Sequence, residues 1–90
     1  MSQKIKEVVR NGRVERRYLA YTANNAVHIR VHELLDGDTT TDTTQSFDLA
    51  DDGETVVHTG ERWDTYARKR FGRLNDARFT HEFQELRGAI

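Results

Sequence analysis

The stretch that decides the fold is AVHIRVHELL, residues 26–35. Aliphatic side chains at every second position from Val27 to Val31 alternate with the polar side chains of His28, Arg30 and His32. This period of two predicts a half-buried antiparallel strand. Glu33 falls on the apolar side of the pattern by count, so we expect the strand to bulge or to end there.

Two further strands are predicted on the N-terminal side of this central strand. Residues 5–10 and residues 13–21 are rich in Val, Ile, Leu and Tyr, which favour extended backbone. Asn11-Gly12 separates them, and this dipeptide suits the positive φ angles of a type I′ hairpin turn. Ala23-Asn24-Asn25 is a second turn signal and separates residues 13–21 from the central strand.

The segment after the central strand is harder to assign. Asp36-Gly37-Asp38 predicts a turn. Residues 39–44 are a stretch of Thr and Asp, which favours either a solvated edge strand or a loose hairpin loop. Residues 46–50 and 55–58 are each predicted to form a short strand, with a turn between them.

After Gly60 the hydrophobic period changes to that of a helix. Apolar side chains that share one helical face run from Trp63 to Leu74, and the same spacing runs from Phe79 to Ile90. The pattern is compatible with two short helices or with one helix that kinks near Gly72.

Strands first and helices last are typical of an α+β domain. We expect a single compact domain, residues 1–90, that is strand-rich over 4–58 and helical over 61–88. An antiparallel sheet of four to five strands should be followed by a C-terminal helical segment packed on one face. The expected core joins aromatic residues of the helical part to aliphatic residues of the central strand: Trp63, Phe71, Phe79 and Phe83 with Val27, Ile29 and Val31.

Composition and motifs exclude several functional classes. The 90 residues contain no Cys, which removes disulfides, thiolate nucleophiles and Cys-based metal sites. His28 and His32 would lie about 13 Å apart on a strand, too far for one zinc ion, and we predict no metal and no cofactor. The chain has no Gly-x-Ser-x-Gly elbow, Gly-rich phosphate loop or His-Glu-x-x-His motif, so we predict that it is not an enzyme. No apolar run approaches the ~20 residues of a membrane span, so we expect no membrane contact and a cytoplasmic location.

Charge is segregated along the chain although the net charge is only -1. Residues 31–60 contain eight acids and no Lys or Arg, whereas the first twenty residues contain six Lys or Arg and two acids. Two hypotheses follow, because a charged surface selects its partner by charge. In the leading hypothesis the protein is a non-catalytic module, an inhibitor or adaptor, whose acids meet a basic groove on a protein partner. The residues predicted to bind this partner are Asp36, Asp38, Asp42, Asp51 and Asp52.

The alternative hypothesis is a nucleic-acid-binding accessory protein. Arg side chains near Tyr18 and Tyr21, on the face of the sheet, would hold phosphates and stack bases, and the helix would add more cations. A pI of about 6.4 argues against a dedicated nucleic-acid module, because such modules tend to exceed about 9. The residues predicted for this role are Arg13, Arg16, Arg17, Arg30, Arg68, Lys69, Arg70 and Arg73.

In size and composition the chain resembles the small proteins of phages and mobile elements, including anti-CRISPR inhibitors. The likeness lies in a short, Cys-free chain with strong local charge and no catalytic motif. It involves no shared motif, so it implies an inhibitor-like role without assigning that role to any residue.

Overall fold

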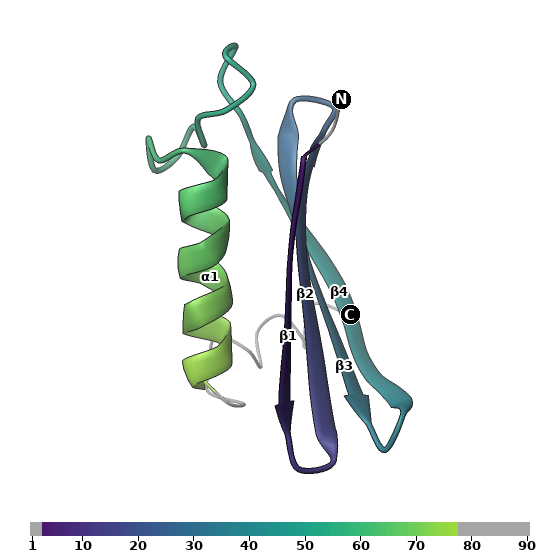
Figure 1. The fold of residues 1–90 in the computed structure, drawn as a ribbon. Coiled ribbons are helices and arrows are strands. Elements are labelled where there is room, and N and C mark those ends of the chain that lie inside the picture. Colours follow the sequence, from purple (N-terminus) through teal and green to yellow (C-terminus); the bar gives the residue numbers. More distant parts are fainter. Residues whose placement is uncertain (1–2, 78–90) are drawn as a thin grey trace.

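Residues 3–77 are described by the computed structural model, and Figure 1 shows their arrangement. Within this range, four strands pair antiparallel in the order β1-β2-β3-β4, and one helix, α1, packs on one face of this sheet. The predicted α+β class is confirmed. The elements are β1 (Lys4–Asn11), β2 (Val14–Ala23), β3 (Ala26–Leu35), β4 (Asp38–Asp48) and α1 (Trp63–Ala77).

The second and third hairpins turn through residues with positive φ. Asn24 and Asn25 have φ angles of 53° and 56°, and Asp36 and Gly37 have φ angles of 52° and 85°. Two successive positive φ angles match the type I′ turn, whose twist suits that of the flanking strands. Both turns lie where the sequence predicts them.

The first hairpin differs from the prediction. Asn11 pairs with Val14, so the central residues of the turn are Gly12 and Arg13, and of these only Gly12 has a positive φ, 62°. Glycine at the first central position with one positive φ matches a type II′ turn. The predicted type I′ turn at Asn11-Gly12 is therefore wrong, because β1 continues through Asn11.

Glu33 neither ends β3 nor leaves its apolar face. It is 3% exposed, and β3 continues to Leu35. The irregularity that we expected lies on the neighbouring strand instead. Glu33 pairs with Thr41 while Leu34 pairs with Thr39, so Thr40 is the extra residue of a β-bulge in β4. The Thr/Asp stretch is thus an edge strand rather than a loose loop.

The predicted short strands at 46–50 and 55–58 do not form as separate elements. Residues 46–48 are the end of the long strand β4, and residues 49–62 form a connection held by two isolated bridges, Leu49 with Val56 and Thr55 with Arg62. Asp52 closes the turn in this connection by accepting hydrogen bonds from the backbone N–H groups of Glu54 and Thr55 at 2.8 and 2.9 Å.

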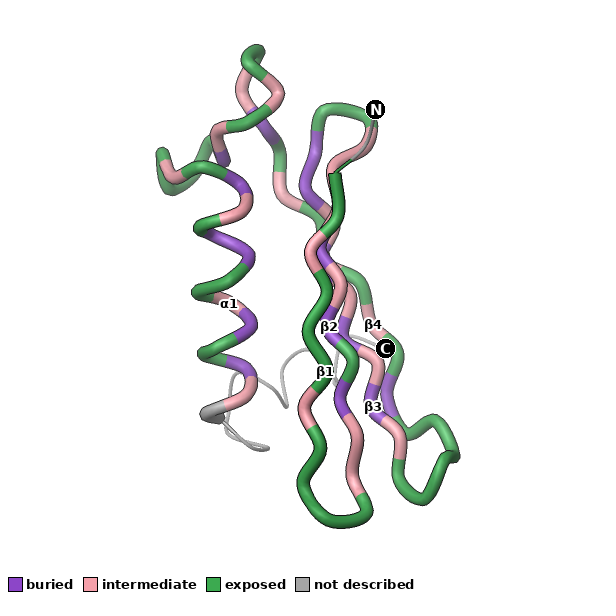
Figure 2. Tube along the Cα trace, in the orientation of Figure 1, coloured by how far each residue is buried: buried purple, intermediate pink, exposed green. Residues whose placement is uncertain are grey.

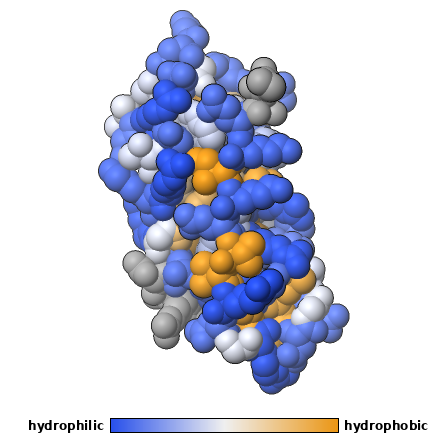
Figure 3. All heavy atoms as spheres, viewed as in Figure 1, coloured by the Kyte–Doolittle hydropathy of each residue, from blue (hydrophilic) through white to orange (hydrophobic). Residues whose placement is uncertain are grey.

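The core lies between α1 and the sheet, as the burial colours in Figure 2 show. Trp63 and Phe71 are buried in one cluster with Val27, Ile29 and Val31, as predicted. Phe79 and Phe83 lie outside the described residues, as does the predicted helical stretch beyond residue 77. On the side that Figure 3 shows, apolar patches are small and are separated by hydrophilic side chains.

Within residues 3–77, α1 is too short and too polar to cross a membrane.

Candidate functional site

The sheet has one face under α1 and one face that α1 does not cover, and we call the second the open face (Figure 1). Side chains alternate between the two faces along each strand, so the register assigns them. Ile5, Tyr18 and Val27 mark the covered face. The open face carries Lys4, Lys6, Val8, Arg10, Glu15, Arg17, Leu19, Tyr21, Ala23, Ala26, His28, Arg30, His32, Leu34, Thr39, Asp42, Thr44, Ser46 and Asp48.

A shallow apolar pocket lies at the centre of the open face. Its volume is about 240 Å³. Val8 and Leu19 form its apolar part, and Val8 is 55% exposed. The cross-strand pairs Lys6 with Leu19, Val8 with Arg17 and Leu19 with Arg30 surround this apolar part with cations. An apolar centre with a charged rim is the usual anatomy of a protein interface.

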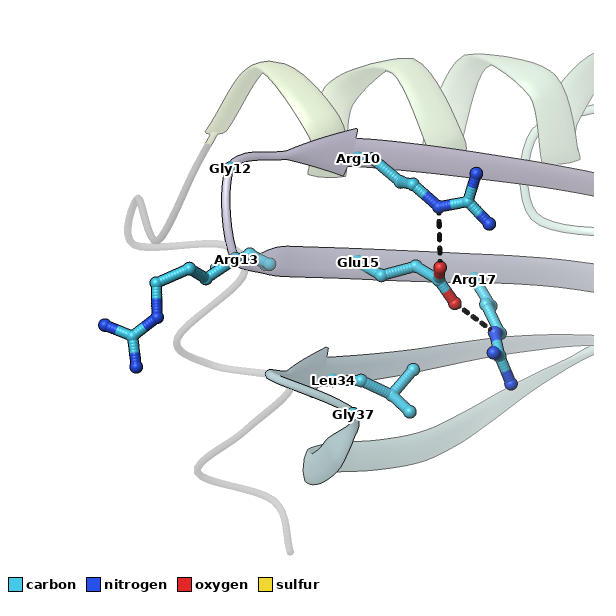
Figure 4. Close-up of a pocket in the computed structure, with 8 residues that line it drawn as sticks. Arg10, Gly12, Arg13, Glu15, Arg17, Leu34 and Gly37 are labelled. Atoms are coloured by element: carbon cyan, nitrogen blue, oxygen red, sulfur yellow. Dashed lines mark hydrogen bonds and ion pairs between the residues drawn. The ribbon is translucent and has the colours of Figure 1, made fainter.

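A second pocket adjoins the first toward the hairpin tips, and the two share Arg17. Its volume is about 210 Å³, and Figure 4 shows its lining. Glu15 lies between two arginines: Arg10 Nε donates to Oε1 at 2.7 Å and Arg17 Nε donates to Oε2 at 2.5 Å. These hydrogen bonds from Arg10 and Arg17 lower the pKa of Glu15.

The β3–β4 side of the open face holds a further ion pair. Arg30 donates from Nε and from a terminal nitrogen to the two oxygens of Asp42, both at 2.7 Å. This bidentate contact lowers the pKa of Asp42. Next to it, Tyr21 stacks on His28 with ring centroids 4.9 Å apart, and His28 Nδ1 lies 2.7 Å from Ser46 Oγ.

The five acids predicted to bind a protein partner do not share one surface. Asp36 and Asp38 lie at the β3–β4 hairpin, Asp42 lies on the open face, and Asp51 and Asp52 lie in the connection before α1, at the other end of the sheet (Figure 1). Three of them already have internal partners: Asp36 pairs with Arg13, Asp42 with Arg30, and Asp52 with its own turn. A joint role for the five in binding stays a prediction.

The predicted nucleic-acid-binding residues are also spread over the molecule. Only Arg17 and Arg30 lie on the open face. Arg13 sits at a hairpin tip, where it contributes to the lining of the second pocket and donates from Nε to Asp36 (Figure 4). Arg68, Lys69 and Arg73 are exposed on α1, whereas Arg70 lies over the Phe47 ring with its guanidinium carbon 5.4 Å from the centroid.

Arg16 belongs to the interior rather than to a nucleic-acid surface. Its side chain is 7% exposed and its Nε donates to Glu33 Oε2 at 3.0 Å. Tyr18 is buried beside it on the covered face and packs on Phe71 with ring centroids 5.3 Å apart. Burial raises the pKa of Tyr18. Neither side chain is available to a phosphate or a base.

Sequence reasoning named Arg13, Arg17 and Arg30 of the two pockets, for another role, but missed the apolar residues and one of the arginines. Val8, Leu19 and Arg10 were not among the predicted site residues, although the register brings them together. The signal was present in β1, where Lys6, Val8 and Arg10 alternate with Ile5 and Val9. Because both sets contain an aliphatic residue, the alternation alone did not say which set faces the core.

Among residues 3–77, no group of three or more His, Cys, Asp or Glu side chains is placed to hold a metal ion. The chain matches no protein-family model, no curated protein and no solved structure.

Proposed function

We propose that this protein is a non-catalytic binding module, an inhibitor or adaptor, that docks on a protein partner through the open face of its sheet. The observation that carries the proposal is the apolar centre at Val8 and Leu19 inside a rim of charged side chains. Cytoplasmic location belongs to the same proposal. The resemblance in size and composition to small proteins of phages and mobile elements is compatible with this role.

The charge of the open face favours a protein over a nucleic acid. Five Lys or Arg side chains lie there with three acids, Glu15, Asp42 and Asp48, so the excess of positive charge is only two. Arg10, Arg17 and Arg30 are already held in ion pairs. A phosphate chain, which is charged at every nucleotide, would have to compete with both Glu15 and Asp42 along its length, whereas a protein segment with a single acid would compete only with Glu15.

The aromatic residues of the open face favour the same choice. Single-stranded nucleic acids are held by exposed ring faces on which bases stack. Tyr21 and His28 instead stack on one another, and His28 Nε2 also lies 3.0 Å from the carbonyl oxygen of Ala23. The ring faces that meet in this stack are therefore not available to stack on bases.

The test is affinity capture with the purified chain and a matched set of variants. Leu19→Glu places a charge at the apolar centre, and Arg68→Gln/Lys69→Gln removes two cations from the exposed side of α1. We expect a protein captured by the wild type to be lost with Leu19→Glu, retained with the helix variant, and unaffected by nuclease. Circular dichroism of each variant controls for folding.

Two results would refute the proposal. Capture that survives Leu19→Glu places the working surface elsewhere. Capture that nuclease abolishes favours the alternative, a nucleic-acid-binding accessory protein, and direct titration with single- and double-stranded DNA and RNA would then show salt-sensitive binding.

A further inference from the structure

We infer that the segment held on the open face is an extended acidic–apolar strand, with a carboxylate on the N–H donors of Arg10 and Arg17 that Glu15 does not use and an apolar side chain on Val8 and Leu19. This inference rests on the proposed function and adds the chemistry of the partner. Its basis is the contact between a charged pocket and an apolar pocket that share one residue, Arg17.

The spacing of the two pockets matches an extended peptide. Arg17 and Leu19 are two residues apart on β2, which separates their positions by about 6.8 Å. Side chains on one face of an extended peptide have the same spacing. A segment with an acid at one position and an apolar residue two positions later therefore reaches both pockets without bending.

Glu15 shows how the partner's carboxylate would be held. Its two oxygens each accept one Nε–H, from Arg10 at 2.7 Å and from Arg17 at 2.5 Å. Both arginine side chains are largely exposed, at 74% and 53%. A guanidinium has five N–H donors, so each arginine retains donors beyond the one that Glu15 uses. Glu15 thus orients both arginines and also competes with the incoming carboxylate.

Charge complementarity selects this partner over a second copy of the chain. Two open faces that met would each bring an excess of positive charge and would repel one another. An acidic segment is attracted by the same excess of positive charge. Its apolar residues supply the apolar contact area that a highly charged polyanion lacks.

The experiment is an NMR titration of the full chain, with backbone amide shifts as the readout, at low salt where surface charges are least screened. The main probe is the synthetic peptide Glu-Ser-Leu-Ser-Glu-Ser-Leu-Ser with blocked ends. One control peptide replaces Glu by Lys, and a second replaces Leu by Ser. We expect shifts centred on Val8, Arg17 and Leu19 with the main probe, and weaker binding with each control.

Variants separate this site from a general effect of charge. Arg10→Gln/Arg17→Gln should lower the affinity for the main probe by roughly 2- to 25-fold, because each arginine contributes up to about fivefold. Arg68→Gln/Lys69→Gln removes the same charge from α1 and should leave the affinity unchanged. Glu15→Gln removes the competing carboxylate and should strengthen binding by up to about fivefold, whereas a purely structural Glu15 predicts no gain.

Equal shifts with the Lys peptide, or shifts confined to α1, would overturn the inference. So would tighter binding of a single-stranded oligonucleotide of equal charge at the same residues. These results are distinct from a failure of the proposed function: capture that depends on Leu19 would still stand if the acidic peptide failed. Capture that does not depend on Leu19 would refute both the proposed function and this inference.

Discussion

Removal of either member of the buried pair Arg16–Glu33 should destabilise this protein severely. The two side chains are 7% and 4% exposed, with Arg16 Nε 3.0 Å from Glu33 Oε2, and Thr40 Oγ1 donates to the other oxygen at 2.8 Å. Glu33→Leu or Arg16→Leu leaves a charge that neither water nor its former partner can stabilise. Loss of one member of a buried pair typically costs about 3–5 kcal/mol.

That loss is large against the total stability of the chain. A protein of 90 residues has a free energy of unfolding of about 5–13 kcal/mol. The double variant Arg16→Leu/Glu33→Leu should recover most of the loss, because two apolar side chains of similar size remove both desolvation costs. Thr40 is exposed, so its hydroxyl can bond to water in these variants.

Urea unfolding followed by circular dichroism measures these differences, with a constant m-value as the check that unfolding stays two-state. Asp42→Asn is the matched control, because its pair with Arg30 is 41% exposed on both sides and should cost less than about 1 kcal/mol. If Glu33→Leu costs no more than this control, or if the double variant is as unstable as the single ones, the reasoning about burial is refuted.

Three further predictions concern the core, the acid range and the backbone. Phe71→Ala should lower the free energy of unfolding by about 3–5 kcal/mol, while Thr65→Ala on the exposed side of α1 should change it little. Thermal and urea unfolding measure both variants, and equal losses for the two would contradict this prediction. The Thr55 hydroxyl and two backbone N–H groups lower the pKa of Asp52 from its ordinary value of 3.8. The unfolded chain therefore binds this proton more tightly than the folded chain does. The stabilisation that ionised Asp52 contributes is complete above pH 3.8 and is lost as pH falls through the folded-state pKa. Asp52→Asn should flatten the acid limb of a stability–pH profile, and an unchanged limb would contradict this. Gly12→Ala, at φ 62°, should destabilise by about 1 kcal/mol, whereas Gly72→Ala inside α1 should stabilise by about 0.5–1 kcal/mol, and melting temperatures that move in the same direction would contradict the backbone assignment.

Local patterns predicted most of the secondary structure because they record local geometry. The alternation over residues 26–35 placed β3, and the change of period after Gly60 placed α1 to within two residues of its start at Trp63. The prediction failed where a distant strand decides the outcome. Glu33 stays on the covered face because Arg16 comes from the neighbouring strand to pair with it, and no local pattern records that contact.

The sequence by itself determined the class of the fold, the central strand and part of the core, since side chains alternate in a strand and recur along a helix whatever lies around them. Only the tertiary structure decided which charges meet. The basic N-terminal strands and the acidic segment look like two opposed surfaces along the chain. Antiparallel register brings them side by side instead, with Arg13 beside Asp36 and Arg30 beside Asp42. Register depends on turn geometry and on the bulge at Thr40, so the open face and its two pockets emerge only when the strands pair.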